Sequence, residues 1–260
     1  MKLCSLVVLI LLICACTQSG YTQFYTPTLD PKTTPNYSPL GPDEEPEVFS
    51  TDNFDRDISI FLARHYEVVG SSSFNGPYED TKNAIRQAKK VGATVVLISA
   101  QYTNTLTQTA PLIVPSSQAT YHSGTVYSGS SVGGYSGTST SYAASTVPIT
   151  TQHQRYDQNA VYLVKFTGKI RFGFAMLELT PEQRSALGRN SGVFLSVVYE
   201  ETPAFDANVL VGDVLVAIDG QPVKNVDHAM QLLENIPQGT PTTTITVVRG
   251  DVENVIVLKL

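Results

Sequence analysis

The sequence is poor in cysteine, and its few cysteines lie at the N-terminus. They are Cys4, Cys14 and Cys16, and no other position of the 260-residue chain carries a thiol. A mature chain that starts at Cys16 therefore has no second thiol for a disulfide bond and no cysteine set for a metal ion. The four histidines also lack the spacing of metal ligands. We expect no metal site and no cofactor.

Charged residues are scarce as well. Asp, Glu, Lys and Arg make up 15% of the chain, and the formal net charge is −6. Binding to nucleic acid requires clustered Lys and Arg that neutralise phosphates, so this composition argues against a nucleic-acid partner. The hydrophobic fraction of 42% still suffices for packed cores. Length and composition together predict two modest domains with flexible segments.

The N-terminal apolar run is too short for a membrane-spanning helix. Leu6–Ile13 follows a single positive charge at Lys2, whereas a spanning helix needs about 20 apolar residues. A short positive segment followed by such a run is typical of a secretory signal peptide, which we predict at residues 1–15. A plain signal peptide and an uncleaved anchor are both compatible with this pattern.

The end of that run, Leu12-Ile13-Cys14-Ala15-Cys16, resembles the lipobox of bacterial lipoproteins. The resemblance implies that Cys16 becomes the acylated first residue of a mature protein held in the cell envelope. Position 17 is threonine and not the aspartate associated with inner-membrane retention in enteric bacteria, which favours the outer membrane. Acyl chains would anchor the protein firmly, because each buried methylene contributes roughly 0.8 kcal/mol.

Residues 16–49 are rich in proline, threonine and tyrosine. Proline recurs at positions 27, 31, 35, 39, 42 and 46. Frequent proline disfavours helix and favours an extended, polyproline-like chain. We therefore predict a tether that reaches on the order of 100 Å from the membrane at about 3.1 Å per residue.

Residues 50–166 predict a small α+β domain. Apolar residues recur at helical spacing in 54–65 and in 78–91, and strand-like runs occupy 66–70 and 93–100. A strand, a helix and a second strand with short connections predict a right-handed βαβ unit if the two strands are parallel. Two further segments, 102–109 and 150–166, are predicted to be the arms of a long β-hairpin.

Between these arms, residues 116–146 are Ser, Thr, Gly or Tyr at 24 of 31 positions and contain no charged side chain. Such a composition buries too little apolar surface to order by itself, so it predicts a mobile loop. An adhesive patch, in which the tyrosines make the contacts, is the alternative. The hydrolase-like spelling Gly129-Ser130-Ser131-Val132-Gly133 lies here, without the flanking strand and helix that a nucleophilic serine requires. No catalytic constellation is visible elsewhere, and we expect the protein not to be an enzyme.

The C-terminal part, residues 167–260, carries three motifs in a fixed order. They are a Phe-Gly-Phe loop at 172–174, a Thr-Pro-Ala turn at 202–204, and Gly-Asp-Val-Leu with Ile-Asp-Gly in 212–220. In this order they resemble the PDZ domain of bacterial HtrA-type envelope proteases. The resemblance implies a partly open β-barrel with two helices that binds extended peptides, and it does not extend upstream into a protease domain. Asn208 stands where the family has glycine, so we expect it at positive φ.

The Phe-Gly-Phe loop suggests how a peptide terminus would be held. A glycine between bulky neighbours lets successive backbone N–H groups converge on a carboxylate, and Arg171 would add attraction for that anion. The resemblance implies that the following strand is an open edge and that the helix 226–233 forms the other wall. Val226, Met230 and Leu233 share one helix face at i, i+4 and i+7, which fits either an apolar pocket or core. The predicted peptide-binding residues are Arg171, Phe172, Gly173, Phe174, Ala175, Met176, Val226, Met230 and Leu233.

The sequence thus predicts an α+β protein: a small βαβ-containing domain with a long β-hairpin, followed by a PDZ-like domain. The leading hypothesis is a non-enzymatic, lipid-anchored envelope protein that captures protein C-termini or other extended peptides. A structural or adhesive surface lipoprotein, whose PDZ fold binds no ligand, is the rival. An uncharacterised hydrolase is a third hypothesis.

Overall fold

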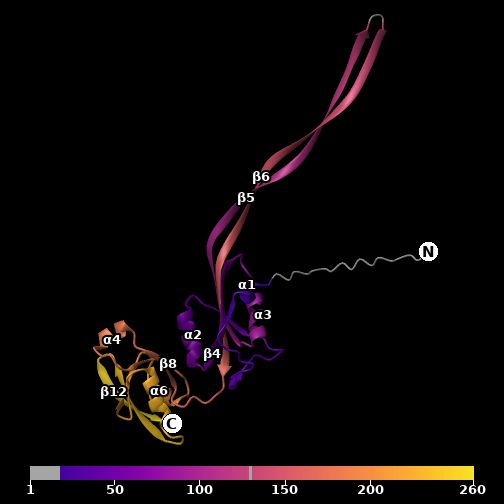
Figure 1. The fold of residues 1–260 in the computed structure, drawn as a ribbon. Helices are drawn as coiled ribbons and strands as arrows, with labels where there is room; N and C mark the ends of the chain where they lie inside the picture. The colour runs from indigo at the N-terminus through magenta and orange to yellow at the C-terminus, as the bar shows by residue number, and fades with distance from the viewer. Residues whose placement is uncertain (1–17, 129–130) are drawn as a thin grey trace, which may run out of the picture. The chain divides into compact units, whose positions relative to one another are not determined.

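The computed structural model describes residues 18–128 and 131–260 (Figure 1). The predicted signal peptide and the predicted lipid-anchor residue, Cys16, lie outside the described residues. The chain is a mixed α/β protein that consists mostly of strands. It divides into two compact units, one of which contains only 75–78 and 101–157. In the part of the chain that the structure describes, no helix is long and apolar enough to cross a bilayer.

The N-terminal sheet has the strand order β1-β4-β6-β5-β3, with β2 paired to β6. Its strands are β1 (Tyr25–Pro27), β2 (Tyr37–Ser38), β3 (Glu47–Ser50), β4 (Tyr66–Gly76), β5 (Val95–Ser128) and β6 (Ser131–Phe166), and its helices are α1 (Gly20–Gln23), α2 (Phe54–Ala63) and α3 (Thr81–Val91). The predicted succession of strand, helix and strand is present as β4, α3 and β5. However, β6 lies between β4 and β5, so the two strands are not neighbours as a simple βαβ unit would have them.

Local signals in the sequence explain where α3 begins and ends. The side chain of Asp80 caps the helix by accepting a hydrogen bond from the backbone N–H of Lys82 (2.8 Å). Gly92 ends the helix with a φ of 78°, a left-handed conformation that glycine adopts without strain. Ala84 and Ala88 lie on the buried face and pack in one core cluster with Val69. Their small side chains let the helix pack closely against the sheet.

The prediction of an extended tether is wrong for residues 18–49. Tyr21 is only 2% exposed and belongs to the same core cluster as Val69 and Tyr162. The hydroxyl of Tyr25 donates a hydrogen bond to the carbonyl of Val69 (2.9 Å). Composition misled the prediction because the aromatic side chains of this segment contribute buried surface, whereas its prolines interrupt helix without preventing short strands and turns.

The prediction of a mobile loop at 116–146 is also wrong for the described residues. The predicted hairpin arms continue through this segment as β5 and β6, which are neighbours in the sheet. Ser116 Oγ donates to the carbonyl of Ala143 (3.2 Å), and Ser141 Oγ donates to that of Gln118 (3.3 Å). Serine and threonine side chains thus bond across the ribbon, where β-branched and tyrosine residues also favour extended backbone.

The C-terminal part forms a second sheet with the order β12-β11-β9-β8-β7, curled into a half-barrel, with β10 paired to β9. The strands are β7 (Phe174–Glu178), β8 (Val193–Val198), β9 (Val214–Ile218), β10 (Gln221–Pro222), β11 (Thr242–Arg249) and β12 (Val252–Lys259). The helices are α4 (Pro181–Leu187), α5 (Pro203–Asp206) and α6 (Val226–Glu234), so a one-turn helix, α5, adds to the two expected. The core of this C-terminal part includes Leu195, Leu215, Ile245 and, from α6, Ala229.

A buried ion pair fixes the turn that follows α5. Asp213 is fully buried and receives two hydrogen bonds of 2.7 Å from the guanidinium of Arg249. The pKa of Arg249 is raised, chiefly by its hydrogen bond to Asp213. Nη2 of Arg249, which also donates to Asp213, donates a further hydrogen bond to the carbonyl of Asn208 (2.9 Å). The φ of 60° at Asn208 confirms the predicted left-handed conformation.

Candidate functional site

Strand β7 is an edge strand. It pairs in antiparallel register with β8, from Phe174 opposite Val198 to Glu178 opposite Val193. Among the strands that the structure describes, none pairs with its other side. A row of backbone N–H and C=O groups along this side is therefore available to an added strand.

The helix α6 lies beside this strand. The carboxylate of Glu178, the last residue of β7, accepts a hydrogen bond from the backbone N–H of Val226, the first residue of α6 (2.8 Å). The side chain of Asn225 caps the same helix by accepting from the N–H of His228 (2.9 Å). The N-terminus of α6 is thereby held at the C-terminal end of β7, which sets the spacing between strand and helix at that end.

The loop before β7 is shaped by Gly173. Its φ is 101°, a backbone conformation that residues with a Cβ rarely adopt. The carbonyl of Gly173 accepts from the N–H of Tyr199 (2.9 Å), and that of Phe172 accepts from the N–H of Ala204 (3.0 Å). These bonds fix the loop to the end of β8 and to the start of α5.

The structure gives a reason for this glycine that the sequence did not reveal. A Cβ at position 173 would lie 2.0 Å from Oγ1 of Thr202, and that hydroxyl itself donates to the carbonyl of Tyr199 (2.6 Å). The absent side chain therefore makes room for Thr202. A substitution at Gly173 consequently perturbs the fold of the loop as well as any ligand contact.

Arg171 is already engaged in the structure. Its two terminal nitrogens donate to the carbonyls of Ile236 (2.7 Å) and Pro237 (2.6 Å), and its guanidinium lies 4.9 Å from the ring centre of Phe172. These acceptors are neutral, so the guanidinium keeps its charge, and the expected attraction of Arg171 for a ligand anion stays a prediction. Arg171 ties the loop to the segment that follows α6.

The apolar residues that were predicted to line the site differ in how exposed they are. Phe172, Phe174, Met176 and Val226 are partly buried against the domain core, whereas Leu233 is 7% exposed and belongs to that core. Met230 is 47% exposed and is the predicted helix residue most accessible to a ligand. Ala175 is half-buried on β7.

The predicted list of binding residues omitted two residues of β7. Leu177 is exposed next to Met176, and Glu178 makes the contact with α6 described above. The alternation of a short strand offered a signal for Leu177, because neighbouring residues of a strand point to opposite faces. Nothing in the sequence signalled the partner of Glu178, which lies 48 positions away.

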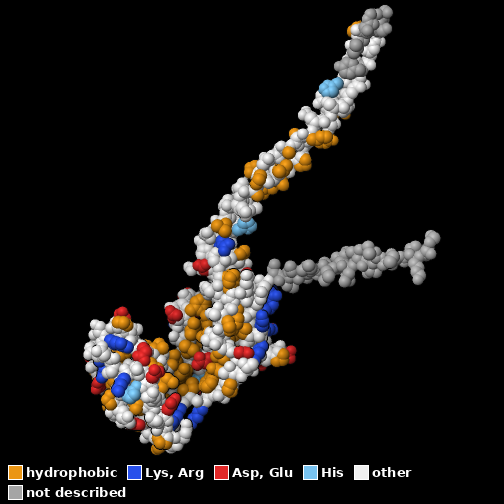
Figure 2. Space-filling model, in the orientation of Figure 1, with side chains coloured by type: hydrophobic (Ala, Val, Ile, Leu, Met, Phe, Trp, Pro, Cys, Tyr) orange, Lys and Arg blue, Asp and Glu red, His pale blue; other side chains and the backbone are white. Residues whose placement is uncertain are grey.

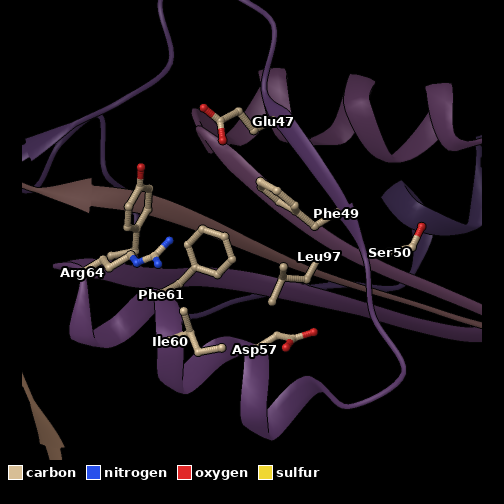
Figure 3. A pocket seen from close by; sticks show the side chains of 9 residues that line it. Glu47, Phe49, Ser50, Asp57, Ile60, Phe61, Arg64 and Leu97 are labelled. Carbon is tan, nitrogen blue, oxygen red and sulfur yellow. The ribbon is translucent and has the colours of Figure 1, made fainter.

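A second concave region lies in the N-terminal domain, between β3 and α2 (Figure 3). Its volume is about 350 Å³, and Phe49 and Phe61 line it with ring centres 5.5 Å apart. Asp57 at its wall is bonded to Arg56, which holds the pKa of this carboxyl below its usual value. Within residues 18–128 and 131–260, no group of three or more His, Cys, Asp or Glu side chains could hold a metal ion.

Comparison with known proteins identifies the class of the C-terminal domain. Residues 170–260 match the family model described as PDZ domain. The C-terminal part of the chain is therefore a PDZ domain, and its edge strand and helix are β7 and α6.

The chain is also similar to parts of individual proteins. The magnetosome formation protease MamE of Magnetospirillum gryphiswaldense is 34% identical over 86 residues, which are 32% of this chain and 11% of MamE. The HtrA-type protease AlgW with decapeptide is 22% identical over 38% of this chain and 36% of that chain, with a TM-score of 0.30. The HtrA3 PDZ domain bound to a phage-derived ligand is 19% identical over 35% of this chain and 84% of that chain, with a TM-score of 0.31. The chain thus spans about a tenth of MamE and about a third of AlgW.

Proposed function

We propose that this protein is a lipid-anchored bacterial envelope protein whose PDZ domain binds extended peptides, protein C-termini above all. The observation that carries the proposal is the outer edge of β7, which no described strand occupies, beside the accessible Met230 of α6. An extended peptide adds to such an edge as a further strand. Main-chain hydrogen bonds supply affinity, and side-chain contacts supply selectivity.

The loop before β7 is the place for the peptide's terminal carboxylate. Gly173 turns the chain there, and the backbone amides of the residues that follow it lead into the open edge. Backbone N–H groups that converge on one point bind an anion without a charged side chain. This fits the finding that Arg171 is committed to carbonyl groups of the protein.

Specificity for a peptide with an apolar last residue follows from the apolar side chains that line the candidate site. Phe172, Phe174 and Met176 come from the strand side, and Val226 and Met230 come from the helix side. Methionine has a flexible side chain that adapts to ligands of different shape. The site should therefore accept a range of apolar C-terminal residues and disfavour charged ones.

The membrane anchor in this proposal is Cys16, which holds the mature protein in the envelope, on the outer membrane. Metabolic labelling with palmitate tests it. The wild-type chain should be labelled and should fractionate with membranes, whereas Cys16→Ser should remain an unlabelled precursor, because lipid transfer requires the thiol. Labelled, membrane-bound Cys16→Ser would contradict the anchor.

The role we propose is that of a non-catalytic scaffold or adaptor. The rival hypothesis, a structural or adhesive lipoprotein with a non-binding PDZ fold, requires the peptide site to be filled by the chain itself. The unpaired outer edge of β7 supports the binding hypothesis over this rival.

A C-terminal peptide library, screened against the full chain by fluorescence polarisation, tests the binding function. Peptides with apolar C-terminal residues should bind. Amidation of their C-terminus should weaken binding about fivefold, because a charge-assisted hydrogen bond becomes a neutral one. Equal affinity for the acid and the amide would mean that the peptide carboxylate does not bind at the Gly173 loop. A library without any binder would favour the rival hypothesis.

A further inference from the structure

The hairpin of β5 and β6 makes few contacts over most of its length. Apart from Thr105, all residues of 104–123 and 136–154 are exposed. At the base of the hairpin, β3 pairs with β5 at 95–98, whereas β4 and β2 pair with β6. Beyond the base, no strand in the described part of the chain covers either outer edge (Figure 1). A two-stranded ribbon by itself is marginally stable in water, so we expect contact with a partner molecule to stabilise this one.

The outer edges of the ribbon lack charged side chains. From position 91 to position 154 the chain contains no Asp, Glu, Lys or Arg. Proteins commonly place charged residues on exposed edge strands to prevent pairing with other chains. Here only three prolines, at 111, 115 and 148, interrupt the rows of backbone N–H groups.

Side-chain hydrogen bonds define which backbone groups point outward. Thr151 Oγ1 donates to the carbonyl of Gln108 (3.3 Å), and Ser145 Oγ donates to that of Val114 (3.4 Å). The carbonyls of these even-numbered residues of β5 therefore face β6. In an antiparallel pair the alternate residues direct their N–H and C=O groups away from the partner, which makes the odd-numbered positions the outward ones. Pro111 and Pro115 fall among these outward positions, where the missing N–H breaks no bond within the hairpin.

One face of the ribbon is apolar. Thr109 and Thr150 bond through their hydroxyls (3.1 Å) and so lie opposite each other, which places 110 opposite 149 and 112 opposite 147. The larger apolar side chains on this face are between 39% and 48% exposed, and they gather partway along the hairpin (Figure 2). They are Leu106, Leu112, Val114, Val147 and Ile149. A contiguous exposed apolar surface of this kind marks an interaction site.

We propose that the hairpin is an assembly element that pairs edge to edge with the hairpin of a second copy of this chain. The outer edge of β5 in one copy adds to the outer edge of β6 in the next, with both hairpins pointing the same way. This arrangement keeps the new strand pair antiparallel and brings the apolar faces of the two copies side by side. Because the hairpin carries no charge over this length, identical copies do not repel one another.

The size of the contact suits a stable complex. The outer edge of about 25 residues in 104–128 is roughly 80 Å long at 3.3 Å per residue. A sheet layer with its side chains is about 10 Å thick, so an edge of this length presents roughly 800 Å² to an added strand. This matches the roughly 800 Å² per partner that specific interfaces bury.

Analytical ultracentrifugation of the full chain in detergent micelles tests the proposal. The wild-type chain should associate with a concentration-dependent mass. The double variant Thr107→Pro/Gln152→Pro removes one outward N–H from each edge and should weaken association at least tenfold. Its matched control, Thr107→Val/Gln152→Val, keeps both N–H groups and should associate like the wild type. A chain that is monomeric at every concentration, or a proline variant that associates as well as its control, would overturn the proposal.

A crosslinking experiment covers the case in which the proline variant misfolds. Benzoylphenylalanine at position 107 of one copy should crosslink to residues 150–154 of an isotopically labelled second copy. Crosslinks confined to a single copy would overturn edge pairing. If the chain is monomeric and sediments with phosphatidylcholine vesicles, its apolar face binds lipid and not a second copy. This result would also overturn the proposal.

Discussion

The carboxylate of Glu178 accepts a hydrogen bond from the backbone N–H of Val226 at 2.8 Å, across 48 positions of sequence. This bond joins the last residue of the open strand β7 to the first residue of the helix α6. Both residues lie at one end of the candidate peptide site. The bond therefore sets the distance between its two walls, and it also satisfies one of the free N–H groups at the helix N-terminus.

Removal of this acceptor should loosen the helix. We predict that Glu178→Ala lowers the free energy of unfolding by about 0.5–1 kcal/mol, because an N-terminal N–H of α6 loses its partner and the negative charge near the helix dipole is lost. Glu178→Gln keeps an acceptor oxygen and should lose less. Urea unfolding of the three proteins measures the difference, and equal losses for Ala and Gln would mean that the hydrogen bond contributes nothing.

Substitution of Gly173 should destabilise the domain even without a ligand. We predict that Gly173→Ala costs about 2–4 kcal/mol, since the new Cβ meets Thr202 and the φ of 101° is strained for alanine. Thr202→Ala in the same chain should recover part of the loss, because it removes the clash and leaves the strained φ. Thermal unfolding of the single and double variants checks this. A double variant that is less stable than Gly173→Ala would rule out the clash as the cause.

The exposed side chain of Met230 should contact the ligand's last residue. We predict that Met230→Lys weakens the binding of apolar-ended peptides by about tenfold or more, because the burial of one side chain contributes at least about 1.5 kcal/mol. Gln231→Lys adds the same charge on a different face of α6 and should leave affinity unchanged. Fluorescence polarisation with the full chain compares them. Equal losses for both variants would indicate a general charge effect and no contact with Met230.

The packing of the N-terminal segment gives a further prediction. Tyr21→Ala should lower the free energy of unfolding by about 3–5 kcal/mol, as expected for loss of a large buried side chain. Tyr142→Ala removes an exposed ring and should change it by less than about 0.5 kcal/mol. Thermal unfolding of both variants distinguishes the packed segment from an extended tether. Identical melting curves for the two variants would support an extended tether at residues 18–49.

The sequence predicted the parts of the fold that local signals determine. The helix expected at 226–233 is α6 (Val226–Glu234), and it begins at the cap residue Asn225. Asn208 has the expected positive φ. Both features depend on a few neighbouring residues, so a single sequence suffices to locate them.

Long-range contacts account for what the sequence did not predict. Tyr21 is buried by residues that come from β4 and β6, and the return of β6 between β4 and β5 changes the expected strand pairing. The engagement of Arg171 by the carbonyls of Ile236 and Pro237 is likewise invisible to local patterns. Composition described 116–146 as unable to order alone, and its order in the structure comes from pairing between the consecutive strands β5 and β6.

Hydrogen exchange of the backbone amides in Phe174–Glu178 tests the central claim most directly. A saturating apolar-ended peptide should slow exchange in β7, because an added strand bonds the amides of its outer edge. Exchange in β12, at the opposite edge of the same sheet, serves as the internal control and should not change. A peptide that binds the full chain and leaves the exchange of β7 unchanged would contradict the claim that this strand is the binding site.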